Sequence, residues 1–118
     1  MIAVVSNAWC KDDGAHADAY IEIAQEFLEF HLAQPGFRGR RLTRGIEDRT
    51  HFVNLRFFDA VSDYEAMIQR DGYKAWIDRM GEHVEWRDPM KEFVEVVLDY
   101  VVDATGAADP SPASPTQR

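Results

Sequence analysis

Residues 34–58 read QPGFRGRRLTRGIEDRTHFVNLRFF, and the architecture of the chain can be worked out from this segment outward. The Pro-Gly pair at its start ends a preceding helix, because proline cannot continue one and glycine adopts the tight backbone that follows. A strand is predicted from Arg38 to Thr43, and a polar turn follows at residues 47–50. His51 to Phe58 then forms a second strand, so the segment is a β-hairpin.

The second strand of this hairpin carries large side chains on both faces. Side chains alternate along a strand, which places Val53, Leu55 and Phe57 on one apolar face. The other face holds Asn54 and Arg56 between two phenylalanines. A strand of this kind has to be covered on both sides. The two polar residues either line a ligand pocket or have a structural role, for instance an Asn-to-backbone hydrogen bond and an Arg-carboxylate pair, since buried polar groups must be paired.

The remaining elements follow from hydrophobic periodicity and turn residues. A strand is expected before the hairpin at Ile2–Trp9, followed by a helix at His16–Ala33 that Asp12 or Asp13 caps. After the hairpin, Ser62 is expected to cap a helix that Gly72 interrupts and that resumes to Met80. We then expect a polar loop at 81–91, a long strand at 92–102, and a disordered Pro/Ala/Ser-rich tail at 103–118.

This order of strand, helix, two strands, helix and strand predicts an α+β fold of the ferredoxin-like type, formed by residues 1–102. Its antiparallel sheet has helices on one face, central first and third strands, and edge second and fourth strands. The helix-free face would hold Val53, Leu55 and Phe57. Leaving each of them exposed to water would lose roughly 1.5–3 kcal/mol of favourable burial free energy. We therefore expect an obligate homodimer whose sheets close face to face.

Charged and ionisable residues on these elements have competing interpretations. Arg38, Arg40 and Arg44 could form a patch for an anionic ligand, but charged residues on a strand more often guard an exposed sheet edge. His31 lies beside the apolar stripe in the last turn of its helix, where a capping or core-edge role is expected rather than a catalytic one. Cys10 has no neighbouring base, which is typical of an inert thiol.

Composition excludes several functions. The chain has 118 residues and a net charge of −8, which argues against nucleic acid and against an anionic membrane surface. No apolar run approaches the roughly 20 residues that a membrane-spanning helix needs. The first residues lack the charged start of a signal peptide, and a single cysteine fits a reducing compartment. We expect a cytoplasmic protein.

Two segments carry a family resemblance: QPGFRGRRLTR, and DRTHFVNLRFFDAVSDYEAM after it. Over about residues 2–102 the chain resembles the antibiotic biosynthesis monooxygenase (ABM) family of dimeric α+β barrels. The resemblance implies a small monooxygenase that uses O₂ on a quinol, an anthrone or a similar polycyclic phenol. It implies no metal and no cofactor. The family also contains haem-degrading oxygenases and members with no known reaction, so a haem enzyme and a non-catalytic dimeric ligand-binding module remain alternatives.

The resemblance also implies which residues form the site. Asn54 would donate to the substrate carbonyl or to bound oxygen, Tyr64 would orient the phenol, and Arg79 lies near an assisting arginine of some members. Phe58 stands where many members have tryptophan. Asn7, on the neighbouring strand, is expected to point the same way as Asn54. The expected substrate-binding residues are Asn7, Trp9, Arg56, Phe58, Met67 and Trp76.

The haem-degrading branch implies a different pattern of residues. Asn7 matches the asparagine of its first strand, but Met67 stands at its tryptophan position and Ile77 at its iron-binding histidine. His83 follows six residues later in the polar loop. Without an axial histidine, haem loses its anchor. Glu82, His83 and Glu85 are read as solvated loop charge rather than as a metal site.

Overall fold

The computed structural model describes residues 1–102 and 108–109 of the chain, and its secondary structure follows the order expected for a ferredoxin-like α+β fold. The predicted tail, 103–118, lies outside the described residues apart from a two-residue strand within it. The elements are β1 (Ile2–Cys10), α1 (Ala15–Leu32), β2 (Phe37–Arg44), β3 (His51–Phe58), α2 (Val61–Ile68), α3 (Tyr73–Gly81), β4 (Val84–Glu85), β5 (Lys91–Glu95), β6 (Val101–Val102) and β7 (Ala108–Asp109).

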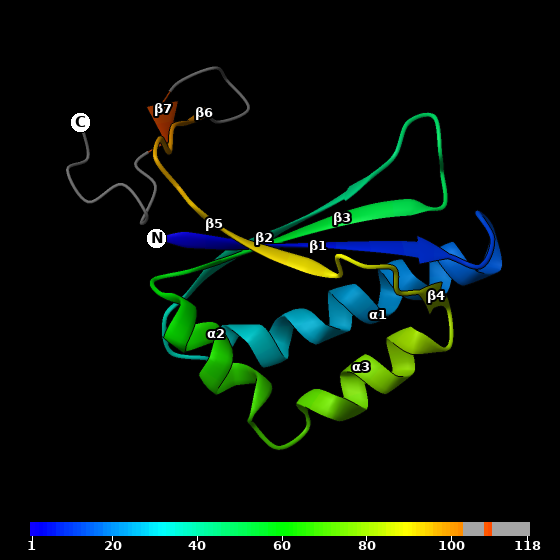
Figure 1. Ribbon diagram of the computed structural model, residues 1–118, viewed down its shortest axis with the longest axis horizontal. Helices are drawn as coiled ribbons and strands as arrows, with labels where there is room; N and C mark the ends of the chain where they lie inside the picture. The colour runs from blue at the N-terminus through cyan, green and yellow to red at the C-terminus, as the bar shows by residue number, and fades with distance from the viewer. Residues whose placement is uncertain (103–107, 110–118) are drawn as a thin grey trace.

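The main sheet is antiparallel, and its three helices all lie on one face (Figure 1). Its order is β2-β3-β1, with β4 and β5 both paired to β1, so β1 and β3 are central and β2 is an edge, as predicted. None of the helices in the described part of the chain is long and apolar enough to cross a bilayer. β6 and β7 pair with each other in a separate two-stranded ribbon.

The register of β1 against β3 determines which residues face the helices. Ser6 lies opposite Asn54 and Val4 opposite Arg56, whereas Asn7 lies opposite Val53. Directly opposite residues share a face. The expectation that Asn7 points the same way as Asn54 is therefore wrong: Asn7 is on the helix-free face.

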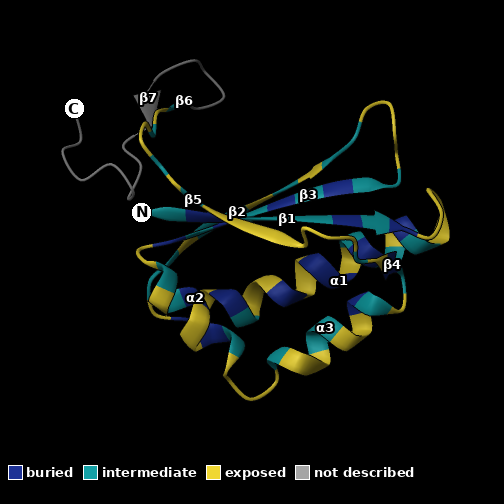
Figure 2. Cartoon of the chain, in the orientation of Figure 1, coloured by how far each residue is buried: buried dark blue, intermediate teal, exposed yellow. Residues whose placement is uncertain are grey.

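Burial follows the same alternation (Figure 2). The four helix-facing residues of β3 are buried, and the four on the other face are only partly covered. Two core clusters lie between the sheet and the helices. One contains Tyr20, Phe27 and Phe52, and the other contains Phe58 and Met67.

The Pro-Gly corner holds the start of β2 against α2. Gly36 has a φ of 81°, which favours glycine, and a Cβ at this position would collide with the carboxyl group of Asp63. The carbonyl of Gly36 accepts a hydrogen bond of 2.9 Å from the Asp59 amide. The predicted corner is present, and its glycine is required both by conformation and by space.

The helix ends agree with the expectation at Asp12 and Gly72 and differ from it at Ser62. Asp12 Oδ1 accepts hydrogen bonds from the amides of Gly14 and His16, so it caps α1 as predicted from just outside the helix. Ser62 is not the cap of α2, because the helix begins one residue earlier and Asp63 accepts from the Ala60 amide. Gly72, with a φ of 93°, separates α2 from α3 as predicted.

The prediction of one long strand over residues 92–102 is wrong. β5 ends at Glu95, which lies opposite Ile2, the first residue of β1, and the Val96 amide makes a last bond to the Met1 carbonyl. Beyond this point the segment has no partner in the main sheet, and it pairs again only at Val101–Val102, with β7. Val97 and Leu98 are consequently more than four-fifths exposed. The predicted loop 81–91 also contains a short strand, β4, which pairs with the end of β1.

Candidate functional site

A pocket of about 310 Å³ lies between the sheet and the helices, where the two core clusters meet. Its volume is at the lower end of the range for small-molecule sites, about 300–1,000 Å³, which suits a compact aromatic ligand. Its wall is mainly apolar, with a few polar groups. The lining residues are Ser6, Ala8, Tyr20, Phe27, Asn54, Arg56, Tyr64, Tyr73, Ile77, Met80, Trp86, Met90 and Lys91.

Asn54 is held in one orientation by Arg40 of the neighbouring strand. Arg40 Nε lies 3.0 Å from Asn54 Oδ1, and Arg40 Nη1 donates to the Ala24 carbonyl of α1 at 2.7 Å. A guanidinium has donors only, so the atom that faces it must be the amide oxygen of Asn54. The NH₂ group of Asn54 is thereby left to donate elsewhere, and Asn54 lines the pocket.

Arg40 was expected to guard the sheet edge, and this expectation is wrong. It points under α1, where burial and the nearby charge of Arg56 lower its pKa to about 10. Arg38 leaves the shared face that alternation predicts, because a register shift interrupts the pairing between Phe37 and Gly39. Arg38 instead pairs with Asp59.

Arg56 is 5% exposed and lines the pocket from the centre of the sheet. Its Nη2 donates to Ser6 Oγ at 3.3 Å, and its Nε has no hydrogen-bond partner in the described part of the chain. Its guanidinium carbon lies 5.2 Å from the centre of the Tyr64 ring. The proposed structural pairing of Arg56 with a carboxylate is not found among the described residues.

Tyr64 contacts both this arginine and Lys91. Lys91 Nζ donates to the Tyr64 hydroxyl at 3.3 Å and lies 4.9 Å from the ring centre. Burial by itself would raise the pKa of the Tyr64 hydroxyl, but the charge of Arg56 and the hydrogen bond from Lys91 outweigh it. The pKa of Tyr64 is therefore lowered, and its phenol gives up a proton more readily than an ordinary tyrosine.

Three of the predicted site residues, Asn54, Arg56 and Tyr64, thus meet at one pocket. Phe58 and Met67 do not reach it: both are completely buried in the neighbouring core cluster, beneath Tyr64.

The other four predicted residues lie elsewhere. Asn7 and Trp9 are on the helix-free face, where Asn7 Oδ1 is 2.9 Å from His51 Nε2 and the Trp9 and His51 rings stack. On α3, Trp76 stacks on Phe27. Arg79 covers Trp76 and pairs with Glu26 in a separate, shallow pocket.

Sequence reasoning missed several polar residues that form or support the pocket, namely Ser6, Tyr20, Tyr73, Lys91 and Arg40. The two tyrosines carried a usable signal. Each stands in an otherwise apolar helical stripe, where a buried phenol hydroxyl needs a polar partner. Lys91 carried none, because its approach to Tyr64 depends on where the loop after β4 returns to the sheet.

The described residues do not fit a metal or a histidine-ligated haem. No three potential metal ligands gather among them. No histidine lines the pocket. His83, whose Nδ1 lies 3.0 Å from His16 Nδ1, lines a separate hollow with Glu22 and Glu26. Burial raises the pKa of the Cys10 thiol to about 11, as befits an inert core residue.

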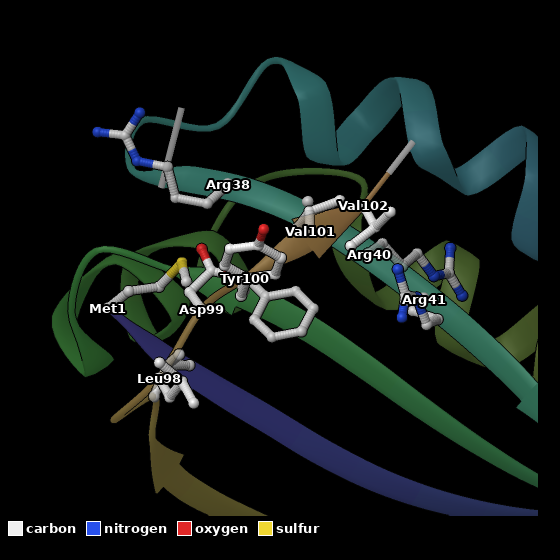
Figure 3. A pocket seen from close by; sticks show the side chains of 12 residues that line it. Met1, Arg38, Arg40, Arg41, Leu98, Asp99, Tyr100, Val101 and Val102 are labelled. Carbon is white, nitrogen blue, oxygen red and sulfur yellow. The ribbon is translucent and has the colours of Figure 1, made fainter. Parts of the chain in front are cut away.

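A larger hollow of about 540 Å³ lies at the β2 edge, beneath the segment after β5 (Figure 3). Arg38, Arg41 and Asp99 are among its lining residues. It adjoins Phe57 of the helix-free face and is roofed by a segment with little packing of its own. It is separate from the pocket that Asn54, Arg56 and Tyr64 line.

The fold and the pocket define a small ferredoxin-like α+β protein with a mainly apolar pocket between its helices and its sheet. The model of the antibiotic biosynthesis monooxygenase family matches residues 1–79, and the chain belongs to this family. No curated protein sequence matches the chain.

Solved structures with the same fold are distant in sequence. SnoaB, a cofactor-independent oxygenase from Streptomyces nogalater, aligns with a TM-score of 0.67 at 15% identity, over 83% of this chain and 93% of its own. An antibiotic biosynthesis monooxygenase aligns with a TM-score of 0.65 at 15% identity, over 83% of this chain and 100% of its own. A conserved protein from Methanosarcina mazei also aligns with a TM-score of 0.65 at 15% identity, over 78% of this chain and 86% of its own. At these identities the likeness concerns the fold.

Proposed function

We propose that this protein is a cofactor-independent monooxygenase that oxidises a quinol, an anthrone or a similar phenolic ring system with O₂. The observation that carries the proposal is the Asn54 amide, whose oxygen is held by Arg40 so that its donors are free in an apolar pocket. Family membership and the cofactor-independent SnoaB neighbour support the same chemistry.

The reaction would begin with loss of a proton from the substrate, giving an electron-rich anion. This anion passes one electron to O₂, and the resulting radical pair combines to form a carbon–oxygen bond. The peroxide then breaks at its O–O bond as the same carbon loses its hydrogen. One oxygen atom stays as the new carbonyl of the quinone, and the other leaves as water.

Several residues of the pocket would each contribute to one step of this reaction. Asn54 would donate hydrogen bonds to the oxygen on which negative charge develops, which is how preorganised donors lower such barriers. Tyr64, whose pKa is lowered, would accept and return the substrate's phenolic proton. Phe27, Ile77 and Met80 would hold the ring flat and exclude water from the reacting carbon.

Oxygen uptake tests this function directly. Purified protein, stripped of metals with a chelator and free of flavin absorbance, should consume one O₂ per molecule of substrate with at least one member of a panel of naphthohydroquinones and anthrones. With ¹⁸O₂, one labelled atom should enter the product and one the water. If ring compounds bind but no member of the panel stimulates uptake, the protein is the non-catalytic ligand-binding module instead.

We also propose that the protein is a homodimer closed through its helix-free sheet face. Val53, Leu55 and Phe57 form the centre of that face and are only partly covered. The segment after β5 adds Val97, Leu98 and Tyr100, all largely exposed, at its side. Partly exposed apolar side chains in the centre of a sheet face mark an interaction surface, and a second copy offers the same face in a two-fold arrangement.

A charge in the centre of this face should separate the two copies. Leu55→Asp is expected to shift the molar mass measured by light scattering from that of two chains to that of one, because an unpaired carboxylate cannot be buried at low cost. Ala66→Asp, which adds the same charge on the exposed side of α2, should leave the mass unchanged. A wild-type protein with the mass of one chain at micromolar concentration would refute the dimer.

A further inference from the structure

The pocket contains two cationic side chains and no acidic one. Arg56 and Lys91 both line it, and no aspartate or glutamate of the described residues does. The four ion pairs found in the described part of the chain involve neither residue. This is unexpected in a chain with 21 acidic and 13 basic residues, where a basic group meets an acidic neighbour easily.

The partners that these two cations do have are neutral and distant. Arg56 donates to a serine hydroxyl and Lys91 to a tyrosine hydroxyl, each at 3.3 Å. A charge-assisted bond to a carboxylate is shorter, about 2.7–2.9 Å. Arg56 is buried, and its Nε has no partner in the described residues. Burying a charge without a counter-ion is costly, so the Arg56 guanidinium is placed for an anion that the described residues do not supply. Lys91, which is exposed, adds a second positive charge to the wall of the same pocket.

The two cations also share one neighbour, the Tyr64 ring, in the wall of the same pocket. The Arg56 guanidinium lies 5.2 Å and the Lys91 ammonium 4.9 Å from the centre of the same Tyr64 ring. Arg40 lies directly opposite Arg56 on the neighbouring strand and adds a third positive charge behind the pocket wall. Like charges opposite one another on a sheet are destabilising, and an anion between the strands and Tyr64 would relieve the repulsion.

We propose that the substrate carries a carboxylate of its own beside the ring that is oxidised, and that Arg56 and Lys91 bind this carboxylate. The planar guanidinium matches a carboxylate in a bidentate fashion, which a neutral quinol could not use. The inference rests on the proposed function for the ring chemistry and adds the class of substrate: a hydroxylated aromatic acid of two or three fused rings, rather than a neutral quinol.

Binding without turnover tests the proposal. Isothermal titration calorimetry of the full chain, with 1-hydroxy-2-naphthoate and with its neutral counterpart 1-hydroxy-2-naphthamide, compares two ligands of the same shape that differ in charge. The acid is expected to bind about tenfold to a hundredfold more tightly than the amide, the factor typical of a hydrogen-bonded charge pair. The preference should shrink as salt is raised, although less than for a surface pair.

Three variants locate the preference. Lys91→Gln, at an exposed position where folding is not at stake, should reduce the preference for the acid about threefold to tenfold. Arg56→Gln should abolish it, with circular dichroism used to check the fold. Lys74→Gln removes a lysine that pairs with Asp78 at the surface of α3 and should leave the preference unchanged.

The outcomes separate this inference from the proposed function. Equal affinity for acid and amide in the wild type would overturn the inference, and so would a preference that survives Lys91→Gln intact. Oxygen uptake with neutral quinols but no preference for the acid would retain the proposed function and reject the carboxylate. A preference that depends on Arg56 and Lys91, with no oxygen uptake, would establish the anion site and reject the oxygenase.

Discussion

Asn54→Ala is expected to lower the turnover number for oxygen uptake about 100-fold or more, with a much smaller change in KM. Removal of one preorganised donor from a site of developing negative charge costs about 10²–10³ in kcat. The same substitution also leaves Arg40 Nε without its acceptor. An unsatisfied charged donor that is partly buried costs about 1–3 kcal/mol, so the melting temperature should fall as well.

Asn54→Asp separates these two effects. Aspartate retains an oxygen for Arg40 and therefore the fold, but it has no N–H to offer the substrate. We expect turnover to be lost in both variants and the melting temperature to fall only in the alanine variant. Stopped-flow oxygen consumption and thermal unfolding measure the two quantities. If Asn54→Ala, once shown to be folded, turns over at the wild-type rate, Asn54 is not a catalytic residue.

Acid should destabilise the protein through His31. This imidazole is completely buried, and its Nδ1 lies 3.0 Å from the Phe27 carbonyl. A carbonyl only accepts, so Nδ1 carries the proton and Nε2 is bare. Burial, followed by the charges of Arg56 and Arg40, lowers the pKa of His31 to about 3 despite the bond to Phe27.

The direction of the pH effect follows from the lowered pKa. Between pH 3 and about 6.5, the ordinary pKa of histidine, the unfolded chain binds a proton at this residue that the folded chain does not. The free energy of unfolding should therefore fall by about 1.4 kcal/mol for each pH unit below about 6.5, and this contribution should be constant above it. The sequence predicted a core-edge histidine, and the observed position makes it a source of acid sensitivity.

Urea unfolding of the wild type and of His31→Gln between pH 4 and 7.5 measures this contribution. Glutamine can still donate to the Phe27 carbonyl but does not titrate. The free energy of unfolding of the variant should therefore depend less steeply on pH, by the slope that one bound proton contributes. Nuclear magnetic resonance of the His31 ring provides the control, since its chemical shift should stay constant down to about pH 4. Parallel pH profiles for the two proteins would show that the acid sensitivity arises at other groups.

Local sequence was sufficient for most of the fold because the signals it depends on are local. The Pro-Gly corner, the hairpin, the interruption at Gly72 and the alternation of β3 are each set by neighbouring residues. The long strand expected at 92–102 failed for a non-local reason. Its residues have the right periodicity, but β1 begins at Ile2 and offers no further hydrogen-bonding partner.

The same distinction divides the candidate site. Alternation along one strand was enough to place Asn54 and Arg56 on a common face, and both line the pocket. The face on which Asn7 lies depends on the register between β1 and β3, because a shift of one residue moves every side chain of a strand to the other face. Phe58 and Met67 are on the correct side, but the packing of α2 against the sheet makes them core rather than lining.

The sequence accordingly defines a ferredoxin-like chain of the ABM family, with Asn54 and Arg56 under its helices. The tertiary structure adds the roles of Arg40 and Lys91. Arg40 reaches Asn54 and Ala24 across two elements, and Lys91 meets Tyr64 from a segment 27 residues away. Charges of distant segments interact only when folding brings them together. The placement of Arg56 and Lys91 in one pocket, from which we infer a carboxylate on the substrate, is therefore a property of the folded protein.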